Sequence, residues 1–152
     1  MNKIANYILI LFLLLLTNCG YEAVLNNQNY QFSINVNKIK GDQKINALII
    51  NSFKQLKENE KKYNLSLTSN KEKLIISKDS KGDPSIFEIK INVNYVVKKD
   101  GKILISNKIN KKTTYNNIAD KFELENYEKN IINNLVSEIT DNIKLSISKV
   151  SE

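Results

Sequence analysis

The sequence contains no histidine, no tryptophan and no arginine, and it has one cysteine and one proline. Without histidine, and with a single thiol, the chain cannot build a Ser-His-Asp triad, a Cys-His dyad or a Cys-His metal site. Its glycines are isolated in the sequence, so no glycine-rich phosphate-binding loop is present. We therefore expect a protein that is not an enzyme and that holds neither a metal nor a dissociable cofactor.

All 23 basic residues are lysines, and they exceed the 16 acidic residues to give a net charge of +7. Arginine is the usual residue for bidentate recognition of phosphates and base edges. Its absence, together with the export signal described below, argues against nucleic acid as a partner. The abundance of Lys, Asn and Ile is typical of an AT-rich genome, so the charge alone indicates only diffuse attraction to anionic membranes or lipid phosphates.

The chain begins with its one long apolar run. Lys3 is the only charge before Tyr7–Leu16, which are ten apolar residues without interruption. At about 1.5 Å per residue the run spans about 15 Å, half of a bilayer's hydrocarbon core, so it is too short to cross a membrane as a helix. A basic start, a short apolar run and a polar exit predict a secretory signal peptide over residues 1–18.

The apolar run ends at the only cysteine. The segment Leu16-Thr17-Asn18-Cys19 resembles the lipobox of bacterial lipoproteins, in which a peptidase cuts before a lipidated cysteine, although Asn18 replaces the usual small residue. The alternative is an ordinary thiol, but a lone exported thiol has no disulfide partner, whereas acylation explains its number and position. We expect a covalent lipid on Cys19. The resemblance implies three acyl chains, which suffice for stable anchoring, and Gly20 implies the outer membrane.

Removal of residues 1–18 leaves 134 of the 152 residues, enough for one modest core. We interpret residues 19–29 as a lipidated tether and 30–152 as a single domain. Hydrophobic periodicity predicts a strand over 30–37, a helix over 43–61, a strand over 63–67 that 73–77 either extends or follows separately, strands over 87–97 and 103–115, and a helix over 119–148. This order, β-α-β-β-β-α, predicts an α+β two-layer sandwich: a mostly antiparallel sheet of about four strands packed by two helices.

Several local features are predicted within these elements. Asp42 is a candidate N-cap for the first helix. The hairpin turn at 99–102 leaves two registers open: a two-residue turn pairs Lys99 with Lys102, whereas a three-residue loop with Gly101 in a bulge keeps one face apolar. We favour the bulged register, which pairs Val97 with Ile103. The last helix has an apolar stripe that we expect in the core, comprising Leu124, Tyr127, Ile131, Leu135, Ile139, Ile143 and Ile147.

The mature chain resembles the LptE family of lipopolysaccharide-assembly lipoproteins. The resemblance rests on the Cys19-Gly20-Tyr21 start, on the strand and helix that follow, on the long strand at 87–97 with its glycine-containing turn, and on the terminal helix. It implies a non-enzymatic lipoprotein at the periplasmic face of the outer membrane, which plugs and helps to assemble the barrel LptD and assists lipopolysaccharide transport. A polar domain suits the polar interior of such a barrel, and Asn-rich and Lys-rich strand faces could hydrogen-bond there.

The partners implied are therefore an LptD-like barrel, lipopolysaccharide and, through the lipid anchor, the membrane. The candidate residues for binding lipopolysaccharide phosphates are Lys98, Lys99 and Lys102 at the hairpin tip, followed by Lys108, Lys111 and Lys112. The plainer alternative for both groups is a solvated surface. Two other functions fit the anchor: an adaptor or accessory subunit of another outer-membrane assembly complex, and an extracytoplasmic enzyme that lacks every familiar catalytic motif.

Overall fold

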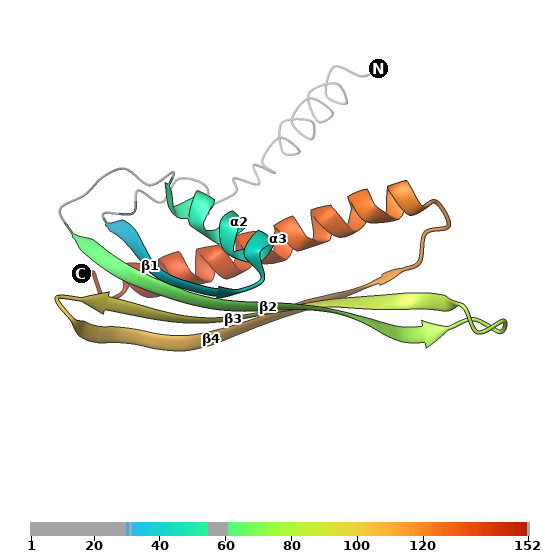
Figure 1. Ribbon diagram of the computed structural model, residues 1–152, viewed down its shortest axis with the longest axis horizontal. Helices are drawn as coiled ribbons and strands as arrows, with labels where there is room; N and C mark the ends of the chain where they lie inside the picture. The colour runs from blue at the N-terminus through green and yellow to red at the C-terminus, as the bar shows by residue number, and fades with distance from the viewer. Residues whose placement is uncertain (1–29, 31, 55–60, 152) are drawn as a thin grey trace, which may run out of the picture.

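The computed structural model describes residues 30, 32–54 and 61–151 (Figure 1). Its elements are β1 (Ser33–Gly41), α2 (Gln43–Lys54), β2 (Lys62–Lys78), β3 (Pro84–Lys99), β4 (Lys102–Asn116) and α3 (Lys121–Ser148). The strands form one sheet in the order β1-β2-β3-β4, in which β1 is parallel to β2 and the other neighbours are antiparallel. The predicted α+β sandwich is confirmed, and residues 73–77 continue β2.

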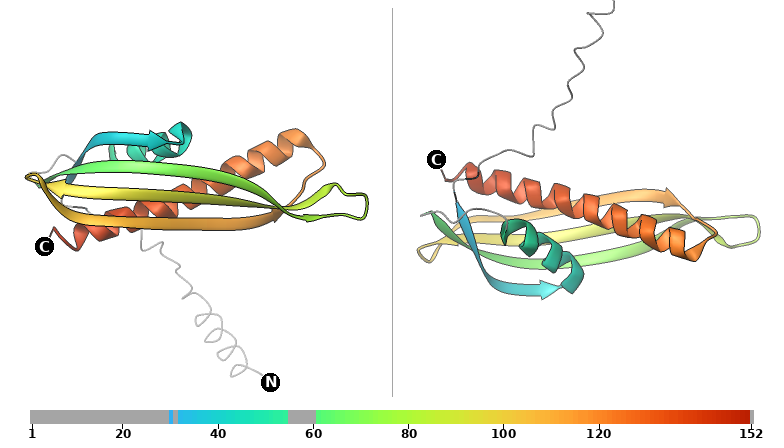
Figure 2. Two further views of the ribbon diagram at one scale, coloured as in Figure 1. Left: turned by 60° about the horizontal axis from the view of Figure 1, so that its bottom comes forward. Right: turned by 90° about the horizontal axis from the view of Figure 1, so that it is seen from above.

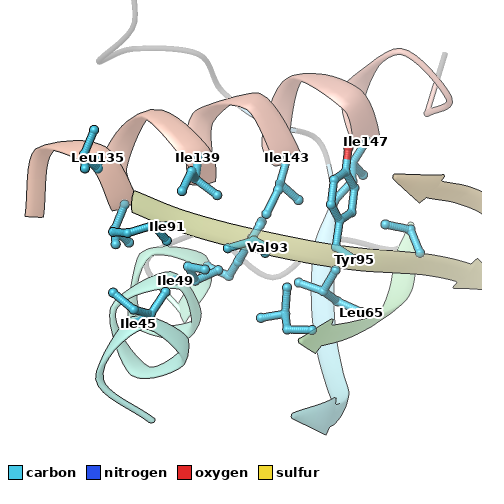
Figure 3. Close-up of a cluster of buried hydrophobic side chains, with 14 of the residues drawn as sticks. Ile45, Ile49, Leu65, Ile91, Val93, Tyr95, Leu135, Ile139, Ile143 and Ile147 are labelled. Atoms are coloured by element: carbon cyan, nitrogen blue, oxygen red, sulfur yellow. The ribbon is translucent and has the colours of Figure 1, made fainter. Parts of the chain in front are cut away.

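Both helices lie on the same face of the sheet, with α2 against β1 and β2, and α3 against β3 and β4 (Figures 1 and 2). Alternate strand residues point toward the helices and form the core with them, as Figure 3 shows for Ile91, Val93 and Tyr95 of β3. No described element covers the other face. The described residues therefore form a two-layer sandwich in which they bury one face of the sheet and leave the other uncovered.

A side-chain cap and one close backbone approach fix the boundary between β1 and α2. The carboxylate of Asp42 accepts the Ile45 N–H at 3.0 Å, so the predicted N-cap is confirmed. Gly41 has φ 89°, and a Cβ there would meet the Ser69 carbonyl oxygen at 1.7 Å, so only glycine lets β1 end against β2. The described helix α2 ends at Lys54; the rest of its predicted extent, residues 55–60, lies outside the described residues.

The register of the β3–β4 hairpin differs from the favoured prediction. Asp100 and Gly101 both have positive φ, 49° and 80°, and form a two-residue turn that pairs Lys99 with Lys102. Leu104 is then an extra residue in β4, so the register shifts and Val97 lies opposite Ile105 rather than Ile103. The bulge lies within β4 instead of in the turn, and the expected apolar face is kept only in part: Ile105 and Ile109 lie opposite Val97 and Val93, whereas Ile103 lies opposite Lys98.

The apolar stripe of α3 is buried along only part of the helix. Leu135, Ile139, Ile143 and Ile147 belong to the core (Figure 3). Tyr127 is 45% exposed, so the expectation that the whole stripe is core is wrong at this residue. The physical reason is visible in Figure 1, in which α3 diverges from the sheet toward its N-terminal end.

Candidate functional site

The uncovered side of the sheet, which we call the open face, carries a broad array of polar side chains. It consists of the strand residues that alternate with the core residues and point away from the helices. These residues include Asn35, Lys38, Lys40, Asn64, Ser66, Thr68, Asn70, Glu72, Glu88, Lys90, Asn92, Asn94, Val96, Lys98, Ser106, Lys108, Asn110, Lys112 and Thr114. Most of this face is polar, and its apolar members are Val96 together with Leu74, Ile86 and Ile103, which pair with Glu88, Asn116 and Lys98 near the strand ends. A surface of this composition meets water or a polar partner.

A row of asparagines crosses the middle of the open face. The pairing register aligns Asn70 of β2, Asn92 of β3 and Asn110 of β4 in one cross-strand row. The Asn110 amide donates a hydrogen bond to the Asn92 side-chain oxygen, and the Asn70 amide donates to Glu72 at 2.8 Å. Because each amide offers both donors and acceptors, this row can bind hydroxyl groups or peptide groups without a change of protonation.

Lysines flank the asparagine row on both sides. Lys40 and Lys108 lie at the two ends of the neighbouring row, while Lys90 and Lys112 lie in the row on the other side. Lys112 binds Glu88 at 2.9 Å, whereas the other three form no ion pair with any described residue. The open face therefore has an excess of positive charge that is free to attract anions.

Strand alternation separates the six lysines proposed from the sequence. Lys98, Lys108 and Lys112 lie on the open face. The other three lysines lie on the helix side. Lys111 binds Glu138 of α3 at 2.8 Å, and the Lys99 ammonium lies 5.7 Å from the centre of the Tyr63 ring. The third, Lys102, is the cross-strand partner of Lys99 at the turn and shares its side.

The six lysines consequently do not form one cluster. Lys108 and Lys112 are four residues apart on β4, which corresponds to about 13 Å along a strand. Lys98 lies four residues along β3 from Asn94, the partner of Lys108, so a similar distance separates it from that row. The geometry is a line of separate positive charges across a wide face. Cys19, the predicted signal peptide and the predicted tether lie outside the described residues.

Sequence reasoning missed Lys38, Lys40 and Lys90 as members of this surface. The alternation in 87–97 could have identified Lys90, because its neighbours on both sides are apolar. Lys38 and Lys40 could not have been placed, because β1 pairs in parallel with β2 through a bulge at Asn37. Their alignment with Ser66 and Thr68 depends on that irregular register.

A polar cluster on the helix side holds α3 against the sheet. Glu128 of α3 accepts hydrogen bonds from the Tyr115 hydroxyl at 2.6 Å and from the Lys73 ammonium at 2.5 Å. Lys73 also lies 4.3 Å from the centre of the Phe87 ring, which stacks on Tyr115. Burial, followed by the hydrogen bond and the charge of Glu128, raises the pKa of Tyr115 well above its usual value.

Neither a membrane-spanning helix nor a metal-binding cluster occurs among the described residues. None of their helices has both the length and the hydropathy needed to span a membrane. Within the same part of the chain, no group of three or more His, Cys, Asp and Glu side chains is arranged to hold a metal ion.

The fold is shared with several solved bacterial lipoproteins. No protein-family model and no curated protein sequence matches the chain. Rare lipoprotein B from Shewanella oneidensis is similar with a TM-score of 0.58 and 14% identity, over 77% of this chain and 96% of that one. An uncharacterized lipoprotein B from Nitrosomonas europaea is similar with a TM-score of 0.58 and 11% identity, over 82% of this chain and 90% of that one. A putative lipoprotein from Caulobacter crescentus is similar with a TM-score of 0.54 and 13% identity, over 80% of this chain and 90% of that one. At these identities the likeness shows a common fold.

Proposed function

We propose that this protein is a non-enzymatic lipoprotein, anchored by a lipid on Cys19 to the periplasmic face of the outer membrane. It plugs and helps to assemble an LptD-like barrel and assists lipopolysaccharide transport to the cell surface. The observation that carries the proposal is the open face, a broad polar and basic sheet surface that no described element covers. The shared fold with proteins described as lipoproteins supports the anchored, extracytoplasmic part of the proposal.

The open face suits the interior of a barrel for two physical reasons. The lumen of an outer-membrane barrel is polar, so a plug needs hydrogen-bonding groups rather than an apolar surface. The asparagine row provides donors and acceptors in one plane, and the two helices behind it fix the strands that present them. A plug of this kind can bury its polar face against the barrel wall without leaving unpaired groups.

The same face offers charges for the phosphates of lipopolysaccharide. Lys98, Lys108 and Lys112 lie on it and form the proposed anion-binding set. Each lysine acts as a compact point charge, in contrast to the planar fork of arginine. Because the charges are spread along the strands, they fit an extended ligand with several phosphates better than a single small anion.

The partner is tested by isolating the mature lipoprotein from detergent-solubilised outer membrane and identifying co-purifying proteins by mass spectrometry. We expect a barrel of LptD size in stoichiometric amount. Recovery of a different barrel complex would favour the adaptor function instead. Recovery of the lipoprotein alone, under conditions that keep other outer-membrane complexes intact, would contradict the plug.

The ligand is tested with two matched triple variants that remove equal charge. One changes Lys98, Lys108 and Lys112 to Gln, and the other changes Lys99, Lys102 and Lys111 to Gln. Each set contains one lysine that forms an ion pair, of which Lys112–Glu88 is the more buried, so the folding of both variants is checked by circular dichroism. We expect the first variant to lose most of its binding to lipopolysaccharide micelles at physiological salt, while the second keeps most of it. Equal losses would show that net charge, rather than the open face, determines binding.

A further inference from the structure

One feature that the proposed function does not use is an open edge of the sheet. β1 pairs with β2 only as far as Gly41, which lies opposite Ser69, whereas β2 continues to Lys78. Among the described residues, the part of β2 after Ser69 pairs with β3 alone. Figures 1 and 2 show β2 and β3 extending well beyond the end of β1. This edge presents backbone groups that can pair with another strand.

The backbone hydrogen bonds identify which residues present those groups. The carbonyl oxygens of Lys61 and Ser69 accept hydrogen bonds from Ser33 and Asp42, so both point toward the β1 side. Because strand residues alternate in direction, the odd-numbered residues that follow point the same way. Lys71, Lys73 and Ile75 therefore have their N–H and C=O groups at the free edge. A bulge after Ile75 ends the regular stretch.

A groove between α2 and α3 opens beside this edge. Its volume is ≈ 660 Å³, and Lys71 of β2 is one of its lining residues. Apolar side chains from both helices also line it, among them Leu48, Phe122 and Ile132. Phe122 is 76% exposed, so a large aromatic ring stands at the groove without being used by the core. Ile75, which pairs with the core residue Phe87 on the helix side of the free strand, is also 50% exposed.

The charges around the groove indicate the chemistry of its occupant. Lys44, Lys71 and Lys129 line it and form no ion pair with any described residue. Of the two glutamates that line it, Glu128 already binds Lys73 and Tyr115, which leaves Glu125 to oppose three ammonium groups. An apolar ligand with carboxylates is complementary to this combination.

We propose that the edge and groove bind an extended segment of a partner protein that contains alternating acidic and apolar residues. The segment adds a strand to β2 at Lys71–Ile75, one apolar side chain enters the groove beside Phe122, and its carboxylates face the lysines. In this mode the main-chain hydrogen bonds supply affinity and the side-chain groove supplies selectivity. The site lies at the edge and on the helix side, away from the open face, so it does not depend on the proposed barrel function.

The test uses the full-length protein in phospholipid nanodiscs and fluorescein-labelled octapeptides with blocked ends. The probes are alternating Asp-Ile, alternating Lys-Ile and alternating Asp-Ser peptides, and binding is measured by fluorescence anisotropy. We expect the Asp-Ile peptide to bind at least about tenfold more tightly than the other two, since each loses either charge complementarity or the apolar side chains. Hydrogen exchange at the amides of Lys71, Lys73 and Ile75 is expected to slow only with the Asp-Ile peptide.

Matched variants locate the binding. Ile75→Pro removes an N–H that points outward, which an edge strand tolerates, and is expected to lower affinity about tenfold, whereas Ile75→Thr keeps that N–H and should lower it less. Phe122→Ser should weaken binding, while Ile103→Ser, which removes a side chain that is 60% exposed near the hairpin turn, should not.

Each of the following results would overturn the proposal: equal binding of the Asp-Ile and Lys-Ile peptides, no detectable binding of the Asp-Ile peptide up to about 1 mM, or unchanged exchange at the edge amides. The exchange measurement uses the unmodified protein, so it decides the question even where Ile75→Pro prevents folding. If the Phe122→Ser and Ile75→Pro variants both bind the Asp-Ile peptide as strongly as the unmodified protein does, the peptide binds at another surface, which also overturns the proposal.

Discussion

The covered and open faces of the sheet are built from the same strands, one residue apart. Ile91 is fully buried beneath the helices, while the next residue, Asn92, belongs to the asparagine row on the other side. One set of alternate positions therefore supplies apolar burial, which stabilises the fold, and the other set is free to vary in polarity. Residues that stabilise the fold and residues that are available for the proposed recognition are therefore direct neighbours along each strand, so neighbouring substitutions should have unlike effects.

The largest expected effect separates the two faces directly. Ile91→Ala should lower the free energy of unfolding by about 2–5 kcal/mol, because it removes buried methylene groups and leaves a cavity. Asn92→Ala should change it by less than about 1 kcal/mol, because the side chain faces outward. Urea unfolding of both variants, followed by circular dichroism, measures the contrast. Similar losses in the two variants would show that the open face is buried in the protein as isolated.

An intermediate effect is expected in the polar cluster on the covered side. Tyr115→Phe removes a hydrogen bond to the charged Glu128 and should cost about 1.5 kcal/mol at neutral pH. Tyr127→Phe, at a residue that is 45% exposed, is the matched control and should stay within about 0.5 kcal/mol. Thermal unfolding at pH 7 measures both. A loss in the control equal to that in Tyr115→Phe would show that the hydrogen bond is not the cause.

The raised pKa of Tyr115 predicts that the free energy of unfolding depends on pH in the alkaline range. Burial and Glu128 raise its pKa in the folded state, so its stabilisation is complete below the unfolded tyrosine pKa of about 10 and declines as the pH rises above that value. Tyr115→Phe should therefore flatten the fall in stability above about pH 10. Part of the fall should remain, because burial and Asp141 also raise the pKa of Tyr30. An unchanged slope in the variant would contradict this assignment.

The smallest effects compare two neighbouring lysines. Lys112 binds Glu88, whose side chain is 10% exposed, whereas Lys111 binds Glu138, which is 56% exposed. Lys112→Gln should cost about 1 kcal/mol and Lys111→Gln about 0.3 kcal/mol, because exposed pairs are weakened by solvent. Both losses should shrink in 0.5 M salt. Urea unfolding at low and high salt tests the pair, and a larger loss for Lys111 would reverse the interpretation.

Much of the fold could be predicted because burial is encoded residue by residue. The alternation in 87–97 predicted the buried side of β3. The pairing register could not be predicted in the same way, because it depends on single extra residues. Leu104 and Asn37 shift the register in β4 and β1, and no local pattern marks either as a bulge.

The candidate site could be predicted only in part for the same reason. The sequence identifies lysines and asparagines on individual strands, but a cross-strand row such as Asn70, Asn92 and Asn110 exists only once three strands are in register. The parallel pairing of β1 with β2, which brings Lys40 into line with Thr68, is a long-range contact. The free edge of β2 follows from where β1 ends, and that position depends on the approach of Gly41 to Ser69.

The parallel pairing of β1 also has a consequence for the order of folding. The strands β2, β3 and β4 are joined by short turns and close at a low entropic cost, whereas β1 reaches β2 only after the crossover that contains α2. The three-stranded meander is therefore expected to form first, with the edge of β2 open along its full length. Refolding at high protein concentration should then compete with association through that edge, until β1 docks and protects its first half.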